Sequence, residues 1–150
     1  MKAVIQRVLR ASVTADGVPA GKCGHGLLLL VGVVPEDTAR DADILAAKIA
    51  KMRIFTDDAD KMNLSVLDIG GSVLAVSNFT LAADISHGNR PSFTSAAKPD
   101  AANPLYAHFC DALRALGVPV ETGVFGADMQ IDTVCDGPVT ILADSAMWKA

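Results

Sequence analysis

Residues Leu27–Val34 read LLLLVGVV, and this continuously apolar run decides the fold class of the chain. Such a run is typical of a β-strand that is buried on both faces, as strands in the middle of a covered sheet are. It is too short to be a membrane span, which needs about 18 apolar residues. The run therefore predicts a central strand of a globular domain.

Further strands are predicted on both sides of this run. The N-terminal strand, Met1–Leu9, continues through Ala11–Thr14 into the turn Asp16-Gly17, and Val18–Cys23 returns as the second arm of a hairpin. The strands expected after the run are Arg53–Phe55, Val73–Val76, Val118–Thr122, Met129–Cys135 and Val139–Ala143.

Two helices are predicted between the strands. Thr38 and Asp41 resemble a capping box, and apolar residues keep helical spacing from there to about Arg53. Asn103-Pro104 is a good helix start, and Gly117 ends that helix. The expected fold class is α+β, a single β-rich domain with two main helices that spans residues 1–150.

Composition limits the function and the location. The chain is 51% hydrophobic and 20% charged, which argues against disorder and indicates an apolar surface such as an oligomer interface. The net charge of −4 means that any nucleic-acid partner must be held by a local patch or by its end. Gln6 and Arg7 stand where a signal peptide needs apolar residues, so we expect a soluble, cytoplasmic protein with reduced thiols.

Several familiar catalytic patterns are missing from the sequence. There is no GxSxG, GxxxxGK, HExxH or GxGxxG pattern, and no histidine stands at metal-ligand spacing to another histidine or a cysteine. His25 and His87 are interpreted as solvent-side loop residues and His108 as a surface or satisfied boundary residue of a helix, although a dyad of a histidine with Cys135 stays open. Side-chain acid–base chemistry is therefore not the expected source of catalytic power.

Short stretches along the chain, in order and without a large gap, resemble one family, the D-aminoacyl-tRNA deacylases. They are Ile5-Gln6-Arg7-Val8 with Ala11-Ser12-Val13, Lys61-Met62-Asn63-Leu64, Gly71–Asp84 (GSVLAVSNFTLAAD), Arg90-Pro91-Ser92-Phe93, Gly126–Gln130, and Asp136-Gly137-Pro138-Val139-Thr140. The likeness covers residues 1 to about 143 and leaves only the tail 144–150. It implies a barrel-like domain with the deacylase fold.

The resemblance also implies an activity. Members of the family hydrolyse the ester that joins a D-amino acid, or glycine mischarged on tRNA-Ala, to the 3′ adenosine of tRNA, and they reject the L-ester. Ser77, Asn78, Phe79 and Thr80 match the family's catalytic segment. We expect the Asn78 and Phe79 amides to meet the carbonyl and ribose end of the substrate, because an activated ester needs mainly positioning and oxyanion stabilisation. Thr80 is either a nucleophile or, as we favour, a positioning hydroxyl.

The family places a Gly-Pro pair, matching Gly137 and Pro138, in a cis peptide that enters the active site of the other subunit. Its carbonyl oxygens would hold the substrate's α-amine and occupy the space that an L side chain needs. Arg7 matches an arginine near this loop and would position it, unless it is an exposed edge-strand arginine. Two positions depart from the family: Asn78 replaces a glutamine, and Cys135 replaces an asparagine.

The partners implied are the aminoacyl 3′ end of tRNA and a second copy of the chain, with both active sites at the subunit interface. No metal, cofactor, membrane or DNA is implied. Four basic residues are either contacts to acceptor-stem phosphates or the solvated face of the first helix: Lys48, Lys51, Arg53 and Lys61. Two other function classes stay open, a non-catalytic module that binds RNA ends and a thiol hydrolase that uses Cys135.

Overall fold

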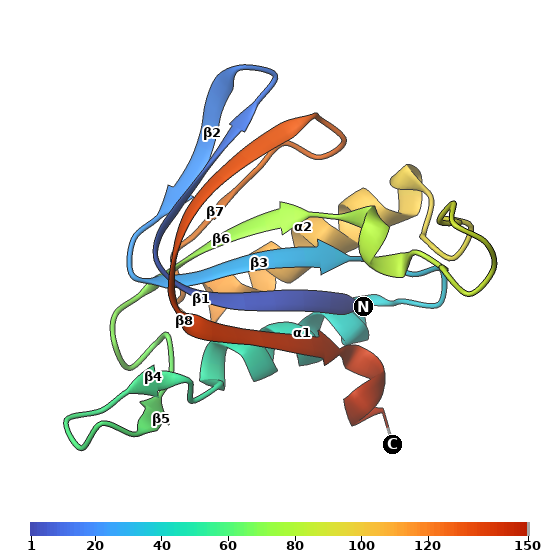
Figure 1. The fold of residues 1–150 in the computed structure, drawn as a ribbon. Coiled ribbons are helices and arrows are strands. Elements are labelled where there is room, and N and C mark those ends of the chain that lie inside the picture. The colour runs from blue at the N-terminus through green and yellow to red at the C-terminus, as the bar shows by residue number, and fades with distance from the viewer. Residues whose placement is uncertain (150) are drawn as a thin grey trace.

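Most of the apolar run of residues 27–34 lies in β3 (Gly26–Gly32), the strand between β1 and β6 in a six-stranded sheet, and the run continues for two residues beyond its end. The computed structural model describes residues 1–149. The strands follow the order β2-β1-β3-β6-β7, and β8 pairs with the other side of β1 (Figure 1). The elements are β1 (Lys2–Ala15), β2 (Val18–Cys23), β3 (Gly26–Gly32), α1 (Ala39–Lys51), β4 (Phe55–Thr56), β5 (Met62–Leu64), β6 (Ser72–Ser77), η1 (Phe79–Ala82), α2 (Pro99–Ala115), β7 (Val120–Thr122), β8 (Met129–Asp144) and η2 (Ser145–Trp148).

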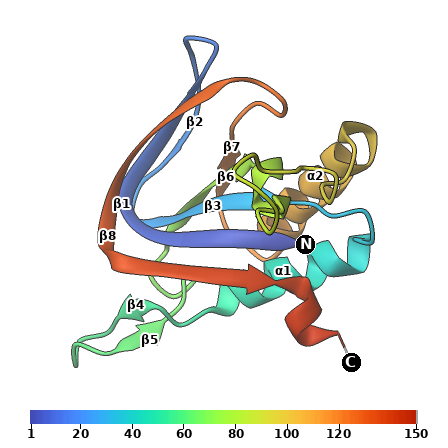
Figure 2. The same cartoon turned by 45° about the vertical axis from the view of Figure 1, so that its right-hand side comes forward.

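The two faces of the sheet are covered differently. Alternate strand residues such as Ile5, Leu29 and Ala75 join α1 and α2 in the larger apolar core. On the opposite face a smaller cluster, which includes Leu28 and Leu74, packs under the β1–β2 hairpin. Figures 1 and 2 show both helices on one side of the sheet, while the hairpin and the first half of β8 rise together on the other side. The result is a half-barrel, which confirms the expected α+β, barrel-like class with two main helices.

The second helix begins earlier than the sequence predicted. It starts at Pro99 with Lys98 as its N-cap, and Pro104 lies inside it. A proline within a helix removes the hydrogen bond to the carbonyl four residues earlier. Here that carbonyl belongs to Asp100 in the first turn, so only one bond near the helix start is lost. The predicted start at Asn103-Pro104 was therefore wrong.

The two predicted C-terminal strands, Met129–Cys135 and Val139–Ala143, form one strand, β8, with a bulge. Thr140 pairs with Gln6 and Cys135 pairs with Val8, so four residues of β8 lie opposite the single residue Arg7. A bulge pushes its extra residues out of the ladder while the strand continues. The Gly-Pro pair is thus part of a protrusion from a paired strand, and its peptide bond is cis.

The two ends of the described chain are joined by buried polar groups. The Met1 ammonium pairs with Asp37 and donates to Ser145 Oγ at 2.8 Å. The hydroxyl of Ser145 donates to the buried Asp41 of α1 at 2.7 Å, and Lys149 Nζ lies 2.6 Å from the same carboxylate. No helix within residues 1–149 is long and apolar enough to span a membrane.

Candidate active site

A cavity of about 840 Å³ opens where β6 ends and η1 begins. Its walls come from β3, the β6–η1 junction, the start of α2 and the segment that leads into β8. Most of the lining is apolar, and its ionisable side chains are those of Lys98 and Asp128. All four residues predicted as the catalytic segment line it: Ser77, Asn78, Phe79 and Thr80.

The Asn78 side chain holds the turn that shapes this wall. It is the N-cap of η1, and its Oδ1 accepts hydrogen bonds from the Thr80 N–H at 3.2 Å and the Thr80 hydroxyl at 2.5 Å. Asparagine is a preferred N-cap because its short side chain reaches the first unpaired N–H groups. The Thr80 hydroxyl therefore donates to an amide oxygen, which is no base, and this arrangement positions the hydroxyl without activating it.

The main-chain N–H groups of this segment differ in whether they already have a hydrogen-bond acceptor within the chain. The Asn78 N–H donates to the Val31 carbonyl at 2.8 Å, so this amide is already paired within the chain, and its use for the substrate stays a prediction that this bond disfavours. The N–H of Phe79 opens η1, where a helix leaves its first donors without intrahelical acceptors, and it has no hydrogen-bond partner among residues 1–149. Phe79 thus supplies the free donor at the cavity wall.

The Phe79 side chain is exposed, although an ordinary strand end would bury it. Its relative exposure is 57%, and its ring meets the Phe93 ring edge-on at a centroid distance of 5.2 Å. Both rings line the cavity. An exposed aromatic pair beside a hollow is typical of a binding site, because burying those rings against a ligand is favourable.

Gly137 and Pro138 do not line this cavity. Their bulge lies beside Val8, which pairs with Gly26 at the start of β3, whereas Ser77 pairs with Val31 near the end of the same strand. At about 3.3 Å per residue these two points are roughly 16 Å apart along β3. Within one chain, the two groups of predicted site residues therefore stay separate.

Arg7 lies directly behind the bulge. Its Nε donates to the Asp136 carbonyl at 2.9 Å, and its Nη1 donates to the Ile54 carbonyl at 2.7 Å. The Asp136 carboxylate lies 3.3 Å from the same Nε. Only 12% of the Arg7 side chain is exposed, which does not fit the alternative of an exposed edge-strand arginine.

His25 lies beside the same β8 bulge as Arg7. His25 was not predicted from the sequence as part of this group. It is half exposed, as predicted, but its Nε2 lies 3.5 Å from Asp136 Oδ2, and its ring packs edge-on against Phe55 at 5.3 Å. No local pattern of residues indicates this pairing. His25 and Asp136 are far apart in the chain, and only the β8 bulge brings them together.

The exposed thiol of Cys135 has no histidine within hydrogen-bonding distance in the described part of the chain. Cys23 and Cys110 are buried, and burial raises the pKa of both, to about 11 for Cys110. A catalytic cysteine needs a lowered pKa or an adjacent base. The two buried thiols have raised pKa values, and no cysteine of residues 1–149 has a histidine as an adjacent base. Nor do these residues hold a group of three or more His, Cys, Asp or Glu side chains that is able to bind a metal ion.

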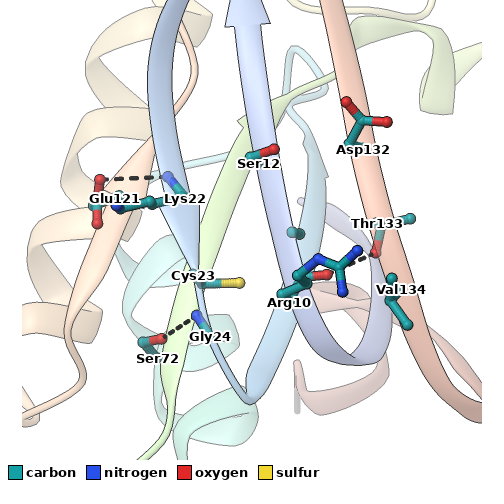
Figure 3. Close-up of a pocket in the computed structure, with 11 residues that line it drawn as sticks. Arg10, Ser12, Lys22, Cys23, Gly24, Ser72, Glu121, Asp132, Thr133 and Val134 are labelled. Atoms are coloured by element: carbon teal, nitrogen blue, oxygen red, sulfur yellow. Dashed lines mark hydrogen bonds between the residues drawn. The ribbon is translucent and has the colours of Figure 1, made fainter.

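A second hollow of about 790 Å³ lies over the β1–β2 hairpin, β8 and β7 (Figure 3). Its charged lining is balanced, with Arg10 and Lys22 against Glu121 and Asp132. The figure shows these side chains spread over separate strands, with bonds only between neighbouring elements. None of the predicted site residues lines this hollow.

The four basic residues considered as RNA contacts lie on α1 and the segment that follows it. Lys48, Lys51, Arg53 and Lys61 are all exposed. Lys48 Nζ stands 5.4 Å from the centre of the Trp148 ring, and Arg53 Nε donates to the Asn63 carbonyl at 3.0 Å. Two of the four cations are thus partly engaged within the chain, while Lys51 and Lys61 extend into solvent.

Comparison with known proteins gives a consistent result. A family model described as D-Tyr-tRNA(Tyr) deacylase matches residues 4–144. A D-aminoacyl-tRNA deacylase of Deinococcus radiodurans is 62% identical over 144 residues, which cover 96% of this chain and 99% of the relative. One of Paracoccus denitrificans is 60% identical over 146 residues, covering 97% of this chain and 98% of the relative.

Solved structures show the same fold. One described as a c-Myc DNA unwinding element binding protein superposes with a TM-score of 0.90 at 39% identity, covering 96% of this chain and 98% of that one. Another, described as a probable eukaryotic D-amino acid tRNA deacylase, has a TM-score of 0.84 at 16% identity, over 95% and 98% of the two chains.

Proposed function

This chain belongs to the D-Tyr-tRNA(Tyr) deacylase family, and on that premise we propose that it hydrolyses the ester of D-aminoacyl-tRNA in the cytoplasm. The enzyme is a hydrolase that releases the D-amino acid and free tRNA. The observation that carries the site assignment is the cavity at the end of β6, which is lined by the whole segment Ser77–Thr80.

The reaction that fits this cavity is attack of water on an activated ester. The water oxygen bonds to the ester carbon, the bond to the ribose 3′ oxygen breaks, and that oxygen leaves with a proton. The Phe79 N–H is the donor for the oxyanion, and the substrate's own 2′-hydroxyl takes part in the proton transfer. Thr80 and Asn78 hold the turn that aims this N–H, which is electrostatic preorganisation by the backbone.

Chirality is checked by Gly137 and Pro138 of a second copy. Within one chain this protrusion is roughly 16 Å from the catalytic segment along β3, and this separation supports the proposal that it meets the cavity of a second copy. Its carbonyl oxygens then bind the α-amine and fill the place of an L side chain. Arg7 fixes one end of the protrusion through the Asp136 carbonyl.

The uncovered face of the sheet supports the dimer. Leu142, Val4 and Leu30 form a row across β8, β1 and β3, on the face opposite the helices. Leu142 is 70% exposed, and the other two are half-buried. Exposed apolar rows of this kind mark interfaces, and a two-fold dimer would supply each cavity with one protrusion.

A paired deacylation assay tests the activity. D-Tyr-tRNA and glycyl-tRNA-Ala should both lose their amino acid, while L-Tyr-tRNA should survive, because glycine has no side chain to exclude. Spontaneous hydrolysis without enzyme is subtracted. Comparable cleavage of the D- and L-esters would overturn the role of Gly137 and Pro138, and no cleavage of any ester would favour an RNA-end binding module.

Complementation tests the shared site. Gly137→Ala damages the protrusion, because an added Cβ would stand 2.1 Å from the Val139 nitrogen. Ala127→Trp fills the cavity from its opposite wall. Each variant alone should be inactive. A randomly reassociated mixture should recover about a quarter of wild-type activity, since half the dimers then contain one intact site. A mixture that stays inactive would argue that each chain supplies its own complete site.

A further inference from the structure

We propose that His25 is a positioning residue for chiral discrimination, acting through Asp136 on the protrusion formed by Gly137 and Pro138. The inference rests on the proposed function of that protrusion. Its basis is the corner where β1, β8, β4 and the β2–β3 turn meet, and where Arg7 and His25 approach the same carboxylate from two sides.

The backbone of His25 is held firmly, although it lies in a turn. Its carbonyl accepts a hydrogen bond from the Ser72 N–H at 3.2 Å, and the Gly24 N–H donates to Ser72 Oγ at 3.2 Å. Gly26 and Gly71 bring the two segments together. An added Cβ would lie 1.8 Å from the Ser72 carbonyl oxygen at Gly26, and 2.8 Å from the His25 carbonyl oxygen at Gly71. These contacts therefore fix the position of the His25 backbone, from which the imidazole extends.

The imidazole is also restrained at its ring. Phe55 of β4 packs against it edge-on, with ring centres 5.3 Å apart and planes at 84°. From that support, Nε2 lies 3.5 Å from Asp136 Oδ2. A ring that already packs against Phe55 loses less conformational entropy when it pairs than a free ring would, which favours the contact with Asp136.

The charged groups recorded at this corner are few. β1 contributes the Arg7 guanidinium and β8 contributes the Asp136 carboxylate, whereas β4 and the start of β6 contribute Phe55 and Ser72, which carry no charge. Histidine is the side-chain type that ordinarily gains or loses its charge near neutral pH, whereas arginine stays charged, so a contact between a histidine and a carboxylate is one that pH can strengthen or weaken.

The consequence is a discrimination that depends on pH. Protonated His25 attracts the Asp136 carboxylate and restrains the residue that immediately precedes Gly137. Neutral His25 leaves that restraint to Arg7 alone. A less restrained protrusion yields more easily to an L side chain, so cleavage of the L-ester should increase as pH rises.

The experiment compares kcat/KM for D-Tyr-tRNA and L-Tyr-tRNA between pH 5.5 and 8.5, with spontaneous hydrolysis subtracted. In the wild-type enzyme the D-to-L ratio should fall about two- to fivefold across this range, the size expected of one partly exposed ion pair. In His25→Ala the ratio should be low and flat. His108→Ala, which removes the exposed contact between His108 of α2 and Asp43 of α1, should keep the wild-type profile.

A double-mutant cycle separates this role from a general packing effect. If His25 acts through the carboxylate, His25→Ala should change nothing further in an Asp136→Asn background. Melting temperatures of the variants control for folding. A wild-type ratio that does not change with pH, or a His25→Ala profile equal to wild type, would overturn the inference. Failure of the proposed function would look different: the wild-type enzyme would show no D-over-L preference at any pH.

Discussion

The guanidinium of Arg7 donates from Nε to the carbonyl oxygen of Asp136 at 2.9 Å, across the bulge where four residues of β8 lie opposite one residue of β1. Through Nη1 the same side chain donates to the Ile54 carbonyl at 2.7 Å. Ile54 is buried, so the protrusion is attached to a rigid part of the chain beside β4. The contacts of Arg7 therefore hold the β8 bulge, and with it the protrusion of Gly137 and Pro138, in a defined position.

Replacing Arg7 with lysine should weaken chiral discrimination. Lysine keeps the charge but loses the planar fork that reaches two carbonyls at once. We expect the D-to-L ratio of kcat/KM to fall about 10- to 100-fold, since hydrogen bonds from charged groups contribute about 1.5–3 kcal/mol each. Arg10→Lys, on the exposed side of the same strand, is the control and should match wild type. An unchanged ratio in Arg7→Lys would remove Arg7 from the mechanism.

Replacing Thr80 with valine distinguishes a positioning hydroxyl from a nucleophile. Valine keeps the branched shape and removes only the hydroxyl that donates to Asn78 Oδ1. We expect kcat/KM for D-Tyr-tRNA to fall about tenfold at most, since one neutral hydrogen bond contributes about 0.5–1.5 kcal/mol. A loss of about 1,000-fold or more, as when a true nucleophile is removed, would contradict the positioning role. Thr80→Ser should retain most of the activity.

Replacing Cys135 with serine, or with the family's asparagine, should leave deacylation within about twofold of wild type. The thiol is exposed and has no histidine within hydrogen-bonding distance among residues 1–149, so it lacks the adjacent base that would activate a nucleophile. Single-turnover deacylation of D-Tyr-tRNA provides the measurement. Abolished activity in Cys135→Ser, together with an unchanged melting temperature, would restore the thiol hydrolase as the better interpretation.

Replacing Asp41 with asparagine should reduce stability in a pH-dependent way. Burial alone would raise the pKa of Asp41, but hydrogen bonds from Lys149, Ser145 and Thr38 outweigh it, and the pKa lies below its usual value. A carboxylate with a lowered pKa in the folded state stabilises the fold at pH values above the pKa that it has in the unfolded chain, about 3.9. This stabilisation is lost as pH falls from there through the lower pKa of the folded state.

Urea denaturation measures this effect. Wild type should exceed Asp41→Asn by about 1–3 kcal/mol at pH 7, and the gap should narrow as pH falls below about 4. The exposed Asp43 of the same helix provides a matched control, because Asp43→Asn should change stability little. A gap that is constant from pH 7 to pH 3 would show that the Asp41 charge does not matter.

Removing two exposed cations tests the RNA contact. Lys51→Gln combined with Lys61→Gln should raise KM for D-aminoacyl-tRNA about two- to fivefold in low salt and reduce the salt dependence of binding, because each phosphate contact releases counterions. KM for a minimal D-aminoacyl-adenosine ester should not change. If KM for the tRNA substrate is also unchanged, these lysines are only the solvated face of α1.

The sequence predicted the secondary structure well where the signal is local. The central strand, the N-terminal hairpin and the Thr38 capping box depend on apolar periodicity or on neighbouring residues, and all three are present. The start of α2 was mistaken because Pro104 favours a first-turn position, whereas Pro99 occupies it in the structure. The preference of proline for the first turn of a helix does not locate the helix start when two prolines lie close together in the sequence.

The same distinction between local and long-range signals applies to the candidate site. Family motifs identified Ser77–Thr80 and Gly137-Pro138 from the sequence, because each is a short contiguous stretch. The availability of individual amides did not follow from sequence. The Asn78 N–H donates to the Val31 carbonyl of the neighbouring strand β3. The register of β6 against β3 decides which amide makes this bond.

The order of apolar and turn-forming residues by itself determined a β-rich domain with two helices, and short contiguous motifs carried the resemblance that implied the family and the two segments proposed for catalysis. Those properties depend on what each residue is and on its near neighbours in the chain. Only the tertiary structure decided that the Gly-Pro pair protrudes from a continuous strand, that Arg7 and His25 meet at Asp136, and that the protrusion and the cavity lie at different ends of β3. The physical reason is that strand pairing brings together residues more than 100 positions apart, and one bulge resets which of them face each other.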